Sequence, residues 1–258
     1  MLKKLVSWAA ICMLALTAAG SVHAQPLQEI TVSAAISLKN AFEEIGNRFE
    51  SQNKGAKVVF NFGASGDLAR QIEGGAPVDV FASAAQKEMD QIDTKGLIVG
   101  ATRVNFAKNT VVLIQSKDST LEIKGFTDLM KPEIKLISIG NPKTVPAGKY
   151  AQEVLTHFNI WEGISPKLVL AENVRQVLDY VTKNEVDAGV VYATDAAIQA
   201  NRIKIVATAP SESHKTVVYP VAVVKGAKNE AGGMAFIAIL KTDEGMGILK
   251  KFGFESAR

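Results

Sequence analysis

Apolar runs alternate with amphipathic helical patterns from residue 29 to the end of the chain. The run EITVSAA, for example, precedes a segment in which Leu38, Phe42, Ile45 and Phe49 recur at the spacing of one helix face. AKVVFNF precedes SGDLARQIEGG, and IKLISIGN precedes PAGKYAQEVLTHFNI, in the same way. Strands that alternate with helices are typical of an α/β fold, in which helices flank the sheets.

The alternation falls into two consecutive series, with no linker rich in Pro, Gly or Ser between them. We therefore expect two lobes, each a sheet flanked by helices, joined by strand-like crossings and separated by a ligand cleft. The first crossing is expected near Phe106–Asn109, and VVYPVAVV is a candidate for the second. The predicted lobes are residues 25–106 together with 219–258, and residues 107–218.

The N-terminal segment, residues 1–24, has two lysines, an apolar run and then small residues that end at Ala24. This order is typical of a secretory signal peptide, and we expect cleavage after Ala24. The alternative is an uncleaved membrane anchor, but Thr17 and Gly20 interrupt a run that is already short for a bilayer span. The sequence therefore predicts a soluble protein in the periplasm.

Removing this segment takes away Lys3, Lys4 and the only cysteine, Cys12, and leaves 27 basic against 26 acidic residues. A chain without cysteine has no disulfide and no thiolate metal site. A near-neutral chain without a Lys/Arg run lacks the electrostatic pattern of nucleic-acid binding. The two remaining histidines, His157 and His214, belong to no cluster with metal-ligand spacing. We therefore expect no nucleic-acid partner, no cofactor and no metal held directly by side chains.

Four junctions between a predicted strand and a predicted helix are candidates for a binding site. They contain Ser37, Ser65, Ala147 and Val174, the last of these behind Asn173, a plausible helix cap. Helix N-termini present free backbone N–H groups and partial positive charge, which together bind anions. In sheets with parallel strands, ligands bind beyond the carboxyl ends of the strands. If these junctions converge, they form an anion site.

Two hypotheses remain for the Ser37 hydroxyl: it caps the following helix, or it holds a ligand. Around the four junctions we find Lys39 as the only nearby cation, together with Asp67 and Glu172. A carboxylate aimed at a bound anion would be costly. We therefore expect Asp67 and Glu172 to point away from the site.

Several segments in order along the chain carry a family resemblance: AAISLKNAFEEI, GASGDLARQIEGGAPVDVFASA, GNPKTVPAGKYAQEVL, SPKLVLAENVRQVLDYV, AGVVYATDA, SHKTVVYPVAVV and ILKKFGF. With these segments the chain resembles the periplasmic molybdate-binding proteins of bacterial ABC uptake systems. The resemblance implies a two-lobed periplasmic binding protein, type II-like, that closes over a tetrahedral oxyanion. It also implies a membrane permease as the partner.

The resemblance further implies five ligand residues: Ser37, Ser65, Ala147, Val174 and Tyr192. Three of them offer hydroxyls, whereas Ala147 and Val174 offer only backbone N–H groups. The ligand implied is molybdate, and also tungstate, in which the metal is already surrounded by oxygen. Sulfate or another tetrahedral oxyanion is the alternative ligand. Fixed donors spaced for long metal–oxygen bonds would bind the smaller sulfate less well.

An enzyme is the competing function class, with Ser65 as nucleophile and His214 as its base. However, GASGD is not the G-x-S-x-G turn that exposes a nucleophilic serine, and no sequence feature pairs the two residues. An adhesin or structural module, which would bind no small ligand, is a third class. We predict that the chain is not an enzyme and acts as a monomeric receptor that delivers its oxyanion to a permease.

Overall fold

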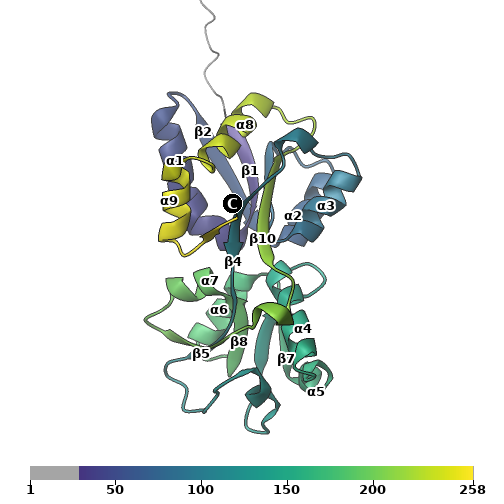
Figure 1. Cartoon of the computed structure of the whole chain (residues 1–258), viewed down its shortest axis with the longest axis vertical. Helices are drawn as coiled ribbons and strands as arrows, with labels where there is room; N and C mark the ends of the chain where they lie inside the picture. The colour runs from purple at the N-terminus through teal and green to yellow at the C-terminus, as the bar shows by residue number, and fades with distance from the viewer. Residues whose placement is uncertain (1–28, 258) are drawn as a thin grey trace, which may run out of the picture.

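The strands form two separate sheets in the computed structural model, which describes residues 29–257 (Figure 1). The first sheet has the order β11-β4-β10-β3-β1-β2, and the second has the order β7-β6-β8-β5-β9. We call each sheet with its helices lobe 1 and lobe 2, respectively. The predicted class, α/β with two helix-flanked sheets, is confirmed. The predicted signal peptide, residues 1–24, lies outside the described residues.

Lobe 1 contains both the beginning and the end of the described chain. Its elements are β1 (Glu29–Ala35), η1 (Ile36–Leu38), α1 (Lys39–Gln52), β2 (Lys57–Gly63), α2 (Ser65–Glu73), β3 (Val80–Ala82), α3 (Gln86–Thr94), η2 (Gly100–Thr102), β4 (Val104–Asn109), β10 (Val217–Val223), α8 (Glu230–Ile239), α9 (Asp243–Lys251) and β11 (Glu255–Ser256). Strand β1 pairs in parallel with β2 and β3, and β10 pairs antiparallel with β3 and β4. The helices α1, α8 and α9 cover one face of this sheet, and α2 and α3 cover the other (Figure 1).

Lobe 2 is formed by the middle of the chain. Its elements are β5 (Val111–Ser116), η3 (Phe126–Met130), β6 (Ile137–Gly140), α4 (Pro146–His157), α5 (Trp161–Ile164), η4 (Ser165–Lys167), β7 (Leu168–Ala171), α6 (Val174–Thr182), β8 (Ala188–Tyr192), α7 (Ala193–Ile198), β9 (Ile203–Thr208) and η5 (Ser211–Ser213). Strand β6 pairs in parallel with β7 and β8, while β5 runs antiparallel to β8 and β9. The parallel strands of each sheet therefore end at one edge.

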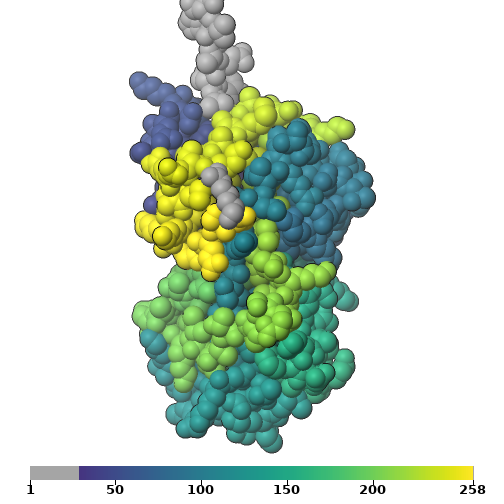
Figure 2. Space-filling view, viewed as in Figure 1, coloured from purple at the N-terminus to yellow at the C-terminus, as the bar shows by residue number. Residues whose placement is uncertain are grey.

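The chain passes between the lobes twice. Thr110 alone separates β4 of lobe 1 from β5 of lobe 2, and residues 209–216 lead back from β9 to β10. Figure 2 shows the two lobes in contact at the waist of the molecule, where these crossings lie. No helix within residues 29–257 combines the length and the apolar character that crossing a membrane requires.

The lobe 1 core follows from the alternation of β1. Ile30, Val32 and Ala34 are fully buried, as expected for one face of a strand packed on helices. Phe42 of α1 packs edge-on against Phe236 of α8, with ring centroids 5.7 Å apart. This packing buries the apolar face of α1 against α8.

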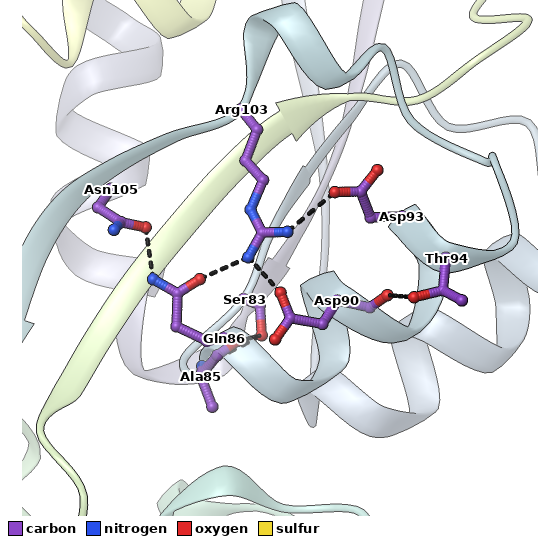
Figure 3. Close-up of polar contacts among 8 residues, drawn as sticks. All are labelled: Ser83, Ala85, Gln86, Asp90, Asp93, Thr94, Arg103 and Asn105. Carbon is purple, nitrogen blue, oxygen red and sulfur yellow. Dashed lines mark hydrogen bonds and ion pairs between the residues drawn. The ribbon is translucent and has the colours of Figure 1, made fainter.

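The sequence patterns did not predict helix α3. A polar network links this helix to the residues at the start of β4 (Figure 3). Arg103 donates to Asp93 Oδ2 at 3.0 Å and to Gln86 Oε1 at 2.7 Å, and it also pairs with Asp90. Gln86 in turn donates to Asn105 Oδ1 at 2.6 Å. The start of α3 is thereby held beside the start of β4.

Candidate functional site

A small cavity lies between the lobes, beyond the carboxyl ends of their parallel strands. Lobe 1 lines it with the turns that follow β1, β2 and β3, and lobe 2 lines it with the first turns of α4 and α6 and the end of β8. The cavity volume is about 10 Å³, close to the minimum for a single water molecule. The structure brings all five sequence-predicted residues to its wall: Ser37, Ser65, Ala147, Val174 and Tyr192.

Ser37 lies in the single 3-10 turn that joins β1 to α1, and it is 3% exposed. The cap position of α1 is Leu38, and no side chain caps that helix. Of the two hypotheses for the Ser37 hydroxyl, the one in which it caps the helix is therefore wrong. Its hydroxyl is instead 3.1 Å from the hydroxyl of Tyr219 in β10, because η1 turns it toward the centre of the sheet.

Ser65 is the first residue of α2 and is fully buried. Its Oγ accepts a hydrogen bond of 3.0 Å from the backbone N–H of Ala84, in the turn after β3. A hydroxyl has one proton to donate besides the lone pairs with which it accepts. Ser65 can therefore donate to a ligand while its oxygen remains held by Ala84.

The two apolar residues of the site begin helices of lobe 2. Ala147 follows Pro146 in the first turn of α4, and Val174 opens α6 directly after its cap, Asn173. The predicted cap is confirmed, since Asn173 Oδ1 accepts from the backbone N–H of Arg175 at 3.0 Å. The first N–H groups of a helix have no partner within it. Ala147 and Val174 thus bring backbone donors to the cavity wall.

The first turn of α4 packs directly on the end of β6. A Cβ atom at Gly148 would lie 1.9 Å from the carbonyl oxygen of Gly140, which no residue other than glycine could tolerate without a shift of the backbone. This contact fixes the height of the Ala147 N–H relative to the sheet.

Tyr192, the last residue of β8, brings the third hydroxyl. The residue is 1% exposed, and its hydroxyl has no hydrogen-bond partner among the described residues. Burial raises the pKa of Tyr192 well above its usual value, so the hydroxyl keeps its proton. A buried hydroxyl without a partner is costly, and one at a cavity wall indicates a group meant to meet a ligand.

Among residues 29–257, no charged side chain lines the cavity. Asp67 pairs with Arg70 on the surface and Glu172 is exposed, so neither carboxylate faces the site, as predicted. Within residues 29–257, no three His, Cys, Asp or Glu side chains gather in a way that could hold a metal ion. The cavity therefore offers hydrogen-bond donors and helix termini, rather than full charges, to an anion.

An ion pair missed by the sequence reasoning lies just behind the cavity. Arg175 pairs with Asp195, which is completely buried, and reaches across to lobe 1, where it donates to Asn40 Oδ1 at 3.0 Å and to the Ser37 carbonyl at 3.5 Å. Burial raises the pKa of Asp195, and the neighbouring Arg175 opposes that shift. Arg175 directly follows Val174, so the expectation that Lys39 is the only cation near a junction is wrong.

The lobes also touch through their backbones. The N–H of Gly66 in α2 donates to the carbonyl of Thr144 in lobe 2 at 3.0 Å. A Cβ atom at Gly66 would lie 2.6 Å from that same oxygen, so the contact requires glycine. Together with the Arg175 contacts, this bond shows that the structure has the lobes closed over the cavity.

The catalytic pairing considered for Ser65 is absent. The Ser65 hydroxyl bonds to the backbone of Ala84, and His214 Nδ1 lies 2.7 Å from the carbonyl oxygen of its neighbour Lys215. Neither side chain activates the other as a nucleophile and base would.

The family model for bacterial extracellular solute-binding proteins matches residues 30–255. The chain belongs to this family. A solute-binding protein of this kind works outside the cytoplasm and is a receptor, which confirms the prediction that the chain is not an enzyme.

This solute-binding protein is 44% identical over 232 residues to the molybdate-binding protein ModA of Escherichia coli, a match that covers 88% of each chain. The periplasmic molybdate-binding protein of Azotobacter vinelandii has the same fold, with a TM-score of 0.79 and 25% identity over 89% of this chain and all of that one. The resemblance noted in the sequence is thereby confirmed. The sulfate-binding protein SubI of Mycobacterium tuberculosis shares the fold alone, with a TM-score of 0.77 and 15% identity over 89% of this chain and 87% of that one.

Proposed function

We propose that this solute-binding protein captures molybdate between its lobes in the periplasm and delivers it to the membrane permease of an ABC transporter. One observation carries the proposal: three buried hydroxyls and two helix N-termini meet at a single cavity that no charged side chain lines. The donors are the hydroxyls of Ser37, Ser65 and Tyr192 and the backbone N–H groups of Ala147 and Val174. Because one chain supplies the whole cavity, we propose that the receptor acts as a monomer.

A cavity that offers donors without a facing acceptor favours a fully ionised oxyanion. Phosphate carries a proton near neutral pH, and that proton would need an acceptor such as a carboxylate. Asp67 and Glu172 lie elsewhere, and Asp195, behind the cavity, pairs with Arg175 and is not part of the cavity wall. The ligand class is therefore molybdate, tungstate and sulfate, whose oxygens accept only.

Size separates molybdate and tungstate from sulfate. Hydroxyls and helix ends that are fixed by their own lobes cannot all shorten their reach to a smaller ion, and hydrogen bonds weaken when they are stretched. Molybdate and tungstate have the same charge and nearly the same dimensions, so we propose that both bind. The E. coli relative is named for molybdate, which supports this choice over sulfate.

Binding would also favour lobe closure. The five donors come from both lobes, and an oxyanion can meet all of them only when the lobes are together. A ligand shifts a conformational equilibrium by its differential affinity for the two states. The lobes would have to part slightly to admit an oxyanion into a cavity of this size, and its bonds to both lobes would then stabilise the closed arrangement.

The test is a titration of residues 25–258 with molybdate, tungstate, sulfate and phosphate, followed by calorimetry and by the emission of Trp161. This tryptophan lines a groove on lobe 2 that Lys87 of lobe 1 also lines, so its surroundings change when the lobes move. We expect one-to-one binding of molybdate and tungstate with a change in emission, and no response to phosphate. Binding of sulfate alone would favour the alternative ligand, and no response to any of the four would contradict the proposal.

A further inference from the structure

A continuous row of hydrogen bonds runs from the first crossing to the cavity. Asn109, the last residue of β4, donates through Nδ2 to Thr194 Oγ1 at 2.8 Å and to Tyr219 Oη at 3.1 Å. Tyr219 Oη lies 3.1 Å from Ser37 Oγ, and Ser37 lines the cavity. Tyr219 itself is fully buried and is not part of the cavity wall.

The direction of the protons in this row follows from its first member. Asn109 Oδ1 accepts the backbone N–H of Thr110 at 2.9 Å, which fixes the amide so that Nδ2 faces Tyr219. An amide nitrogen only donates, so Tyr219 Oη accepts from Asn109. The single phenolic proton is then directed to Ser37 Oγ, the other polar atom in its reach. Ser37, having accepted, keeps its own proton free for the cavity.

We propose that Tyr219 is a positioning residue, which orients the Ser37 hydroxyl so that its proton points at the bound oxyanion. The inference rests on the proposed function, because it assigns a donor to the same ligand. Without Tyr219 the Ser37 hydroxyl can rotate away, and it then has to be reordered at each binding event. Donors linked in series also polarise one another, which strengthens the last bond of the row.

The position of the row relates the site to the lobe crossings. Asn109 lies beside Thr110, Tyr219 lies in the strand that follows residues 209–216, and Thr194 belongs to lobe 2. The same Asn109 amide therefore contacts lobe 2 and the residue that orients a lobe 1 donor. This placement makes the orientation of Ser37 dependent on the arrangement of the crossings.

A double-mutant cycle with molybdate as the probe tests the proposal. Phenylalanine at position 219 keeps the ring, which packs between Phe106 and Phe254, and removes only the hydroxyl. We expect Tyr219→Phe to weaken molybdate binding about tenfold, as for the loss of one ordered bond to a charged group. In a protein that already carries Ser37→Ala, Tyr219→Phe is expected to weaken molybdate binding by less than about twofold. Tyr180→Phe, at a half-buried position of α6 outside the cavity, is the matched control.

The outcomes distinguish the positioning role of Tyr219 from the existence of the oxyanion site. A Tyr219→Phe protein that binds like wild type, or one that loses the same factor in both backgrounds, would overturn the positioning role and leave the oxyanion site intact. If the wild-type protein binds none of the oxyanions, the proposed function fails and the positioning role fails with it.

A second variant covers the case in which Tyr219→Phe does not fold. Asn109→Leu removes the donor that commits the Tyr219 proton to Ser37. The proposal is supported if Asn109→Leu weakens molybdate binding in the wild-type protein but not in a protein that carries Ser37→Ala. An equal loss of affinity in both proteins contradicts it.

Discussion

The two walls of the cavity are built differently. In lobe 1, the donors Ser37 and Ser65 are side chains whose oxygens are already bonded within the lobe, to Tyr219 and to Ala84. In lobe 2, two donors are backbone groups at helix starts, and the third, the Tyr192 hydroxyl, has no partner among the described residues. The lobe 1 wall is therefore oriented before a ligand arrives, and the lobe 2 wall is completed by the ligand.

This difference has a measurable consequence for stability. Removing a hydroxyl that holds a neighbour leaves that neighbour unpaired, which costs about 1–3 kcal/mol when it is buried. Removing a hydroxyl that holds nothing leaves no group unpaired. Variants of the two walls are thus expected to weaken binding alike and to change the melting temperature differently.

The largest effect is expected from Gly148→Ala, which attacks the backbone donors of lobe 2. The new Cβ would meet the Gly140 carbonyl, so the first turn of α4 has to move away from β6. We expect about 1–3 kcal/mol lower stability from overpacking. Molybdate affinity is expected to fall about 100-fold through displaced donors. Calorimetry and thermal unfolding measure both.

Gly247→Ala is the matched control, because it changes a helical glycine of α9 with open space around it. We expect it to retain full affinity. Normal binding by Gly148→Ala would show that the height of the α4 start does not matter to the ligand.

Ser65→Ala comes next and tests the lobe 1 wall. It removes a ligand donor and leaves the buried N–H of Ala84 without its 3.0 Å partner. We expect binding weaker by about 1–3 kcal/mol and a stability loss of about the same size. Ser51→Ala, at an exposed position of α1, is expected to change neither. A Ser65→Ala protein with unchanged melting temperature would remove the difference between the walls.

Tyr192→Phe tests the lobe 2 wall and has the opposite expectation for stability. The change removes a hydroxyl without a protein partner, so the ligand-free protein is expected to melt no lower than wild type. Molybdate binding is expected to weaken about tenfold, because a donor to a charged group is lost. A clear fall in the melting temperature without ligand would mean that the hydroxyl is satisfied by the protein in solution.

The smallest effect is expected from Glu88→Gln. It tests whether the stability change depends on the hydrogen-bond pairing of the buried group that is removed, rather than on the lobe that contains it. Glu88 is a lobe 1 residue, 5% exposed, and its Oε2 has no partner among residues 29–257, although Lys87 Nζ lies 3.9 Å from Oε1. Burial raises its pKa, with Asp90 adding to the shift and Lys87 opposing it.

A raised pKa of a carboxyl in the folded state means that stability falls as the pH rises from the ordinary value of 4.5 through the folded value. Glutamine carries no such charge, so we expect Glu88→Gln to melt a few degrees higher at neutral pH. The difference is expected to vanish below pH 4.5. Melting curves over this range measure it, and a constant difference at every pH would assign the effect to packing instead.

Local sequence signals predicted much of the fold. The run EITVSAA coincides with β1, and the helix expected after Asn173 begins at Val174 with that residue as its cap. These features depend on residues that are neighbours in the chain, which is why pattern and capping rules find them. The predicted convergence of four strand-to-helix junctions is also seen, since the carboxyl ends of parallel strands face the same cavity.

The sequence patterns did not predict contacts between residues that are far apart in the chain. A helix cap was one of two hypotheses for Ser37 because a serine precedes a helix, yet its hydroxyl lies 3.1 Å from that of Tyr219, 182 residues away. The reach of Arg175 to the Ser37 carbonyl spans 138 residues, and no local pattern signals it. Strand β9 was also missed, although its run IKIVAT is rich in the β-branched residues that favour strands.

The touching backbones of Gly66 and Thr144 bear on how long a captured ion stays. The donors around the cavity come from both lobes, and the Gly66–Thr144 contact joins the lobes beside them, so we expect an ion to leave only after the lobes part. The residence time is then limited by the rate at which the lobes open, and a tightly held ion, whose bonds join both lobes, slows that opening more than a loosely held one. A transporter that spreads the lobes would therefore set the moment of unloading itself.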